Sequence, residues 1–298
     1  MKRIVKALVV AVCICAIIIP IKDEYECKLL VNASYGLPAL IRQGEVDNLY
    51  LGSSMFRQGI DIFEANKHGG INYILSYNGN QPVMEEWILK YLISNKVTIG
   101  KLYVDMYVYT AYSEPQISDE KIFMEVGVNE KWQLYQLIPD AGIEKLLRVF
   151  VTANNETLLT WPIQSYLVNQ RFEQGGNITE TQGVTKEQIQ QLTVPQINKK
   201  MNSEQVSAIE EIIQIAKENN IEIVFIETPK YISVAENLEY QEAMEEYEKI
   251  LQQNAVSYLL AEEVWDEEMK ETENFIDLLH LSSTGRQKFS KKIFEFLP

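Results

Sequence analysis

From about residue 46 onward, short runs of β-branched and aromatic residues alternate with longer segments in which apolar residues recur every three or four positions. Such alternation is typical of repeated strand–helix units and predicts an α/β fold with a largely parallel sheet. The predicted strands are Val46–Leu51, Asn72–Tyr77, Lys101–Tyr109, Ile221–Ile226 and Val256–Leu260. The predicted helices are Met55–Ala65, Met84–Ser94, Ser203–Glu218, Ala235–Gln252 and Ser282–Phe296.

The segment from about residue 113 to residue 202 interrupts this rhythm. Helical periodicity over Trp132–Val151 is followed by a polar passage rich in Gln, Thr and Gly, Glu173–Asn202. We therefore predict one domain over residues 46–298 that carries a helical insertion and follows a linker over residues 23–45. The aromatic side chains of the insertion either form a sugar-stacking platform or a lid, or pack in the core, which is the commoner role. They are Trp132, Tyr135, Trp161 and Tyr166.

The longest apolar stretch is Ile4–Ile21, which lies at the N-terminus directly after Lys2 and Arg3. A basic start before an apolar run is typical of a targeting segment. Because no small-x-small cleavage site precedes the polar residues from Lys22 on, we predict an uncleaved membrane anchor over residues 1–22 rather than a removed signal peptide. The positive-inside rule then places the rest of the chain on the extracellular side, and cleavage of the segment would make it a secreted protein.

The composition excludes several classes of function. Forty-two acidic residues against 27 basic ones give a formal net charge of −15, which repels phosphate backbones and argues against nucleic acid as a partner. Two histidines are too few for a His-rich metal site, and no glycine-rich phosphate loop or dinucleotide fingerprint occurs. The sequence therefore predicts neither a metal nor a cofactor, and it does not indicate an oligomeric state.

Residues able to catalyse acyl transfer stand at two places along the chain. A side chain that exchanges protons near neutral pH must be His68 or His280, and His68 lies in a polar turn where we expect it to be exposed. His280 follows Asp277 by three positions, so the carboxylate can hold one ring nitrogen while the other points outward. Ser53 and Ser54 stand where the first strand passes into its helix, at the edge of the sheet where loops and helix N-termini converge. Together these residue types support acyl transfer through an acyl-serine intermediate.

The motifs around these residues resemble a known family. Gly52-Ser53-Ser54 after the first strand and Asp277-Leu278-Leu279-His280 before the last helix resemble the first and last blocks of the SGNH (GDSL-type) hydrolase superfamily. The resemblance implies a three-layer, flavodoxin-like, mostly parallel sheet. It also implies that Ser54 is the nucleophile, with Ser53 in place of the usual aspartate, that His280 is the base and that Asp277 orients it.

The family's second block supplies a glycine whose backbone N–H enters the oxyanion hole, and Gly79 after the second strand is its counterpart. With the backbone N–H of Ser54 it would stabilise the oxyanion. The third block, Gly-x-Asn-Asp, has no counterpart after the third strand, where the chain reads Asp105-Met106-Tyr107-Val108-Tyr109-Thr110. The side-chain oxyanion donor is therefore left open between Asn80, Tyr109 and Thr110.

Three of these positions have alternative roles in the sequence. Either Ser53 caps the helix and Ser54 reacts, or the reverse, because serine after a strand commonly accepts the first free N–H groups of a helix. Gly79 either supplies an oxyanion donor or serves a turn with positive φ. Arg57 either binds an anionic group of the substrate or pairs with Asp61 one turn on.

Taken with Arg57, the targeting segment and the ending Asp-x-x-His-Leu-x-x-x-Gly, the blocks resemble a divergent, membrane-anchored branch similar to surface acyltransferases and esterases. The resemblance implies a serine esterase or O-acyltransferase that acts on O-acyl groups of extracellular glycans or cell-wall polymers. The alternative is a catalytically inactive surface-binding protein that keeps the fold, which the missing third-block asparagine would explain.

Overall fold

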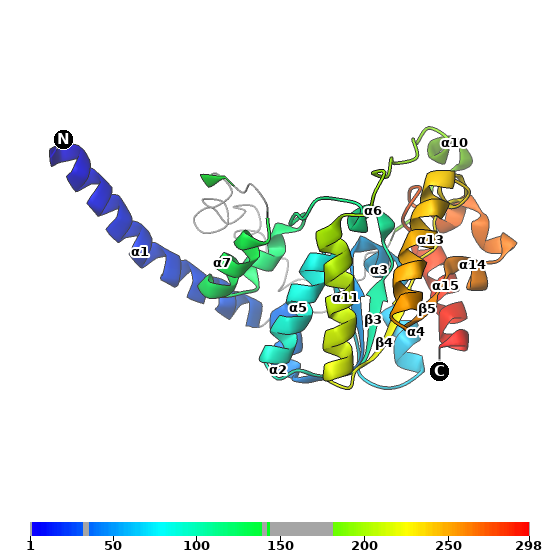
Figure 1. Ribbon diagram of the computed structural model, residues 1–298, viewed down its shortest axis with the longest axis horizontal. Coiled ribbons are helices and arrows are strands. Elements are labelled where there is room, and N and C mark those ends of the chain that lie inside the picture. The colour runs from blue at the N-terminus through cyan, green and yellow to red at the C-terminus, as the bar shows by residue number, and fades with distance from the viewer. Residues whose placement is uncertain (1, 32–35, 139–141, 144–180, 298) are drawn as a thin grey trace.

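A single parallel sheet lies at the centre of the protein. The computed structural model describes residues 2–31, 36–138, 142–143 and 181–297 (Figure 1). Five strands pair in parallel in the order β2-β1-β3-β4-β5. Their bounds are Glu45–Gly52 for β1, Asn72–Ser76 for β2, Thr98–Asp105 for β3, Glu222–Ile226 for β4 and Ser257–Leu259 for β5. The predicted α/β fold with a parallel sheet is confirmed.

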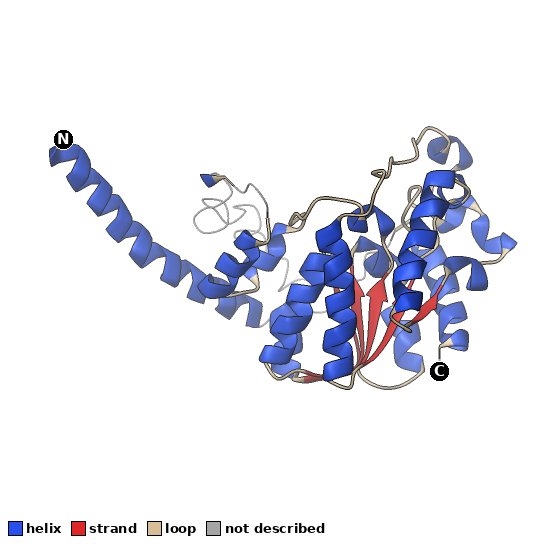
Figure 2. Cartoon of the chain, viewed as in Figure 1, coloured by secondary structure: helices blue, strands red, loops and turns tan. Residues whose placement is uncertain are grey.

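Helices cover both faces of this sheet, which makes three layers (Figure 2). One layer contains α5, Pro82–Ser94, α11, Ser203–Glu218, and α13, Leu238–Gln253. The other contains α3, Ser54–Gly59, α4, Ile62–Lys67, and α15, Ser283–Phe296. The second halves of the central strands β1 and β3 are buried because both faces of the sheet are covered there, as the fully buried Leu49, Leu51 and Leu102 illustrate.

Short elements connect these layers. They are α6, Val108–Ala111, α7, Val128–Gln136, α10, Lys186–Ile189, α12, Ile232–Ala235, and α14, Ala261–Val264. Three 3₁₀ helices are η1, Glu120–Met124, η2, Glu267–Lys270, and η3, Thr272–Asn274.

Two predicted elements have different ends in the structure. The predicted helix Met55–Ala65 is broken into α3 and α4, because the N–H of Asp61 donates to Ser290 Oγ on α15 (2.7 Å) and the Asp61 side chain caps α4. The predicted strand Lys101–Tyr109 ends as β3 at Asp105. The Met106 N–H still donates to Ile226 O (2.9 Å), but Ile226 is the last residue of the neighbouring strand β4. The residues after Met106 therefore find no further partners on that strand.

The predicted insertion lies partly outside the described residues, and Trp161 and Tyr166 are among the residues left out. Helix α7 shows the helical character predicted around Trp132. Trp132 is 47% exposed and stacks on Tyr135 with ring centroids 5.6 Å apart. The prediction that it packs in the core is therefore wrong for this residue.

The N-terminal part of the chain forms α1, Lys2–Val31, and α2, Gly36–Gln43. Within the described residues, no helix combines the length and the apolar character that crossing a bilayer requires, so the predicted N-terminal membrane segment is not supported. Helix α2 packs against β1 and β2, where Leu37 and Leu40 are fully buried.

A buried carboxyl group joins α2 to the end of β2. Glu125 follows η1 and is 6% exposed, and its Oε2 accepts hydrogen bonds from the Tyr77 hydroxyl (2.5 Å) and the Leu37 N–H (3.0 Å). Burial raises the pKa of Glu125 to about 7, although both hydrogen bonds act in the opposite direction. The group therefore keeps its proton in the folded protein at pH values where the unfolded chain loses it.

This shift predicts a pH dependence of stability that Glu125→Gln should remove. Between the ordinary pKa of 4.5 and the folded-state value of about 7, the folded protein binds the extra proton. The free energy of unfolding should thus fall as the pH rises through this window, by up to about 3 kcal/mol. Glutamine keeps an acceptor for Tyr77 and Leu37 but does not ionise. Urea unfolding measures the free energy of unfolding of both proteins, and the value of the variant relative to the wild type should rise between about pH 5 and about pH 8. The same difference between the two proteins at both pH values would contradict the raised pKa of Glu125.

Candidate active site

The turn between β1 and α3 gives its two serines different roles. Ser53 is fully buried, and its Oγ accepts a hydrogen bond from the Met55 N–H (3.1 Å), so Ser53 is the N-cap of α3. Ser54 is the first residue of the helix and is only partly buried. Of the two arrangements left open by the sequence, the structure shows Ser53 as the cap and leaves the Ser54 hydroxyl for chemistry.

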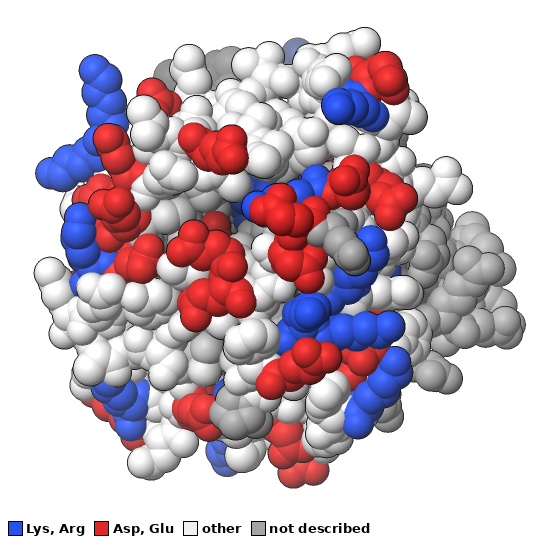
Figure 3. Space-filling model, turned by 90° about the vertical axis from the view of Figure 1, so that its right-hand side faces the viewer, with Lys and Arg blue, Asp and Glu red and all other residues white. Residues whose placement is uncertain are grey.

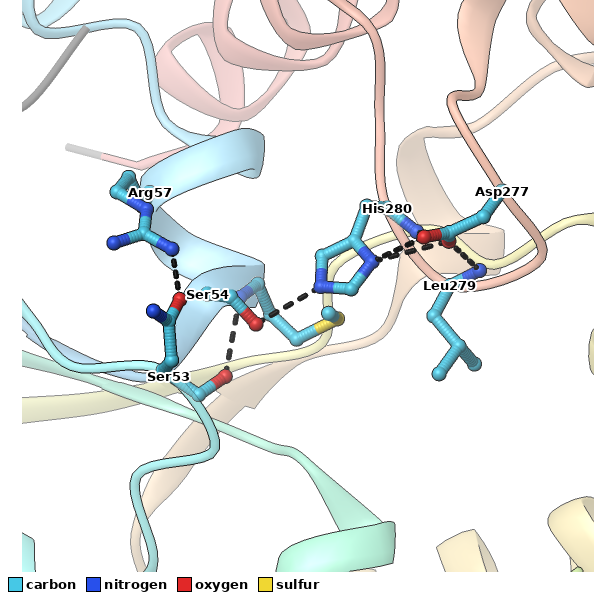
Figure 4. A network of polar contacts seen from close by, with 8 residues as sticks. Ser53, Ser54, Arg57, Asp277, Leu279 and His280 are labelled. Carbon is cyan, nitrogen blue, oxygen red and sulfur yellow. Dashed lines mark hydrogen bonds and ion pairs between the residues drawn. The ribbon is translucent and has the colours of Figure 1, made fainter. Parts of the chain in front are cut away.

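A chain of hydrogen bonds joins Ser54 to the loop before α15 (Figure 4). Ser54 Oγ lies 2.9 Å from His280 Nε2, although 226 positions separate the two residues. On the other side of the ring, His280 Nδ1 lies 2.9 Å from Asp277 Oδ2 and 3.0 Å from Oδ1. With the Nδ1 proton held by the carboxylate, Nε2 is free to accept the proton of the serine hydroxyl.

The Asp277 loop is itself held in place. Asp277 Oδ1 accepts hydrogen bonds from the backbone N–H groups of Leu279 (2.7 Å) and His280 (2.8 Å), and a bridge between Phe275 and Leu281 closes the loop. Burial alone would raise the pKa of Asp277, but the hydrogen bonds from the His280 ring and these N–H groups outweigh it and lower the pKa. The carboxylate is therefore ionised near neutral pH and can stabilise a protonated imidazole.

The loop after β2 lies against the end of the strand that carries the serines. Both the Tyr77 N–H (3.2 Å) and Asn80 Nδ2 (3.3 Å) donate to the carbonyl oxygen of Gly52. Gly79, between them, has a φ of 58°, so the positive-φ turn is real. That turn does not exclude a role for its N–H, because Gly79 belongs to the loop that contacts the start of the Gly52-Ser53-Ser54 turn.

The other two candidates for a side-chain oxyanion donor are engaged elsewhere. The Tyr109 hydroxyl donates to Pro195 O (3.4 Å), and Thr110 Oγ1 donates to Tyr107 O (2.8 Å). Asn80, which is 4% exposed, is the candidate whose side chain contacts the strand end beside Ser54.

Arg57 does not pair with Asp61 as one reading of the sequence proposed, because the Asp61 carboxylate caps α4 instead. The Arg57 guanidinium donates to Asn78 Oδ1 in the loop after β2. Figure 4 shows it on the same helix as Ser54 but on the side away from His280. His68 is exposed, as predicted, and its ring lies 5.3 Å from that of Phe294.

Two buried charged residues at this site escaped the sequence analysis. Asp105 Oδ2 accepts hydrogen bonds from both the Oγ (2.5 Å) and the N–H (3.2 Å) of Ser53. Lys230 follows β4 and is 4% exposed, and burial lowers its pKa although the carboxylates of Glu227, Asp105 and Asp277 act against this shift. The sequence could not place Asp105 at this edge of the sheet, because the predicted strand ran on to Tyr109 and put Asp105 in its interior, whereas β3 ends at Asp105.

Lys230 also borders a cavity of about 540 Å³ that lies between α12, α13 and α14 and is not lined by the triad residues. Acidic side chains gather on this face of the molecule (Figure 3). Those that line the cavity are Glu227, Glu236, Glu245, Glu248 and Glu262. In the part of the chain that the structure describes, however, no three acidic, histidine or cysteine side chains are grouped closely enough to hold a metal ion.

Comparisons with known proteins find similar structures but no similar sequence. No protein-family model and no curated protein match the chain. The chain is similar to a solved structure from Streptococcus pneumonia provisionally described as a platelet activating factor, with 13% identity, 97% of this chain and 99% of that chain covered, and a TM-score of 0.44. It is also similar to a GDSL-like lipase from Bacteroides thetaiotaomicron, with 10% identity, coverages of 86% and 88%, and a TM-score of 0.39. At such TM-scores these likenesses show neither a shared family nor a shared activity.

Proposed function

We propose that the protein is a serine esterase or O-acyltransferase of the SGNH (GDSL-type) kind. The observation that supports this most strongly is the continuous hydrogen-bonded chain from Ser54 Oγ through the His280 ring to the Asp277 carboxylate. A nucleophile, a base and a carboxylate in this order are what acyl transfer through an acyl-serine requires.

In the proposed reaction, Ser54 Oγ attacks the carbonyl carbon of an ester while His280 Nε2 takes the hydroxyl proton. The backbone N–H groups of Ser54 and Gly79, with the Asn80 amide, would stabilise the oxyanion that forms. His280 then gives the proton to the leaving alcohol, and the ester bond breaks to leave the acyl group on Ser54. A water molecule or a sugar hydroxyl attacks the acyl-serine with His280 again as the base, and Ser54 recovers its proton.

The substrate class we propose is a small O-acyl group, such as acetyl, carried by an extracellular glycan or a cell-wall polymer. The basic start and apolar run at the N-terminus support export, either tethered or secreted after cleavage, and Arg57 is a candidate for recognition of an anionic substrate group. The net charge of −15 and the acidic face disfavour nucleic acid. Fractionation of cells that produce the full chain, with detection in membrane and medium, would test the location.

Transfer and hydrolysis differ only in the second acceptor. If water is the acceptor, free acid appears in proportion to the ester consumed. If a sugar hydroxyl is the acceptor, the acyl group appears on an added glycan and little acid is released.

Labelling with a fluorophosphonate probe tests the proposal directly, because the probe reacts with an activated serine and needs no knowledge of the substrate. We expect mass spectrometry to locate the label on Ser54 and no label on the Ser54→Ala variant. Labelling at another serine would overturn the assignment. No labelling of a folded wild-type protein would favour the inactive surface-binding alternative.

A further inference from the structure

The residue before the nucleophile is held by a single carboxylate. The Ser53 hydroxyl donates its proton to Asp105 Oδ2 (2.5 Å), and the Ser53 N–H donates to the same oxygen (3.2 Å). A hydroxyl has one proton to donate, so the lone pairs of Ser53 Oγ then face Met55. Ser53 Oγ accepts a hydrogen bond from the Met55 N–H (3.1 Å). Asp105 therefore sets the rotamer of the cap of α3, and with it the start of the helix that presents Ser54.

The backbone leaves space for this carboxylate through a glycine. A Cβ atom added to Gly52 would lie 2.5 Å from Asp105 Cβ and 3.1 Å from Phe56 Cδ2. The Asp105 side chain thus packs directly against the end of β1, where any larger residue would displace it.

Burial of the Asp105 carboxylate is also unfavourable in free energy. Asp105 is 3% exposed, its Oδ1 has no hydrogen-bond partner among the described residues, and burial raises its pKa while Lys230 and Ser53 act against that rise. Lys230 is 4% exposed, and its ammonium donates to Thr228 O (2.5 Å) and Thr228 Oγ1 (2.9 Å). Both residues are buried, Asp105 at the end of β3 and Lys230 in the loop after β4.

We propose that Asp105 is a positioning residue that aligns the Ser54 hydroxyl with His280 by way of Ser53. This proposal rests on the proposed function.

The positioning role is tested with Asp105→Ala and Asp105→Asn, where the asparagine keeps an acceptor for Ser53. The readouts are the rate of fluorophosphonate labelling at Ser54 and the kcat and KM for p-nitrophenyl acetate. We expect Asp105→Ala to lower the labelling rate and kcat by about 100-fold with little change in KM, since small misplacements of a nucleophile have effects of this size. Asp105→Asn should lose only about 10-fold, because it partly rescues the alignment. Asp61→Asn is the matched control, since Asp61 is a buried helix cap on α4 and asparagine caps equally well.

If the probe labels Ser54 of the Asp105→Ala variant as fast as it labels Ser54 of the wild type, the positioning role is wrong. If Asp105→Ala does not fold, Ser53→Ala should show a similar loss of kcat without a change in KM. This variant removes the hydroxyl bond to Asp105 together with the cap of α3, and it keeps the bond from the Ser53 N–H to Asp105.

The two proposals fail in different ways. If Ser54 of the folded wild-type protein is not labelled, the proposed function is wrong. If Ser54 is labelled and Asp105→Ala behaves as the wild type, the function stands and the positioning role is wrong.

Discussion

Replacement of Ser54 with alanine is expected to lower kcat/KM for ester hydrolysis by roughly 10⁴- to 10⁶-fold while the melting temperature stays close to that of the wild type. The variant removes the hydroxyl oxygen that would carry the acyl group in the proposed reaction, whereas the cap of α3 is the Ser53 hydroxyl and remains. The residual rate would come from binding and from oxyanion stabilisation without a nucleophile. Initial rates on p-nitrophenyl acetate and a thermal unfolding curve measure both quantities.

Ser94→Ala is a suitable control, because Ser94 Oγ donates to Tyr91 O at the exposed end of α5, far along the chain from the triad. It should leave kcat/KM unchanged. Activity of Ser54→Ala within about tenfold of the wild type would show that the reaction does not pass through an acyl-serine at this position.

Replacement of Asp277 with asparagine is expected to lower kcat by roughly 10³- to 10⁴-fold. The backbone N–H groups of Leu279 and His280 both donate to Asp277 Oδ1, so the carbonyl oxygen of an asparagine should take that place. Its amide NH₂ would then face His280 Nδ1 and force this nitrogen to accept. The ring proton moves to Nε2, which can no longer take the proton of Ser54.

The measurement is kcat near neutral pH for the wild type and the variant, with circular dichroism to confirm folding. Glu273→Gln changes a nearby carboxylate that is exposed and pairs with Lys288 (3.5 Å), and it should have no effect on kcat. An Asp277→Asn enzyme with undiminished kcat would exclude a role for the carboxylate in setting the histidine tautomer.

Much of the fold could be predicted because its elements are encoded by local patterns. Helix α11 has the predicted bounds Ser203–Glu218, where the Asn202 side chain caps the first turn and the apolar positions face the sheet. The predicted bounds of the five strands are within about four residues of those observed, because each strand contains a short run of β-branched, aromatic or other apolar residues. The break between α3 and α4 could not be predicted, since it depends on Ser290, 229 positions away on α15.

The candidate site divides in the same way. The contact between Asp277 and His280 spans three positions in one turn, so the sequence by itself determined that a carboxylate would hold this imidazole. It also determined that two serines would follow a buried strand at the edge of a parallel sheet. Which serine caps the helix and which faces His280 was decided only by tertiary structure, because Asp105 binds Ser53 from a neighbouring strand 52 positions on. The approach of Ser54 to His280 likewise depends on the order of strands that brings residues 226 positions apart together, and local periodicity carries no information on such a contact.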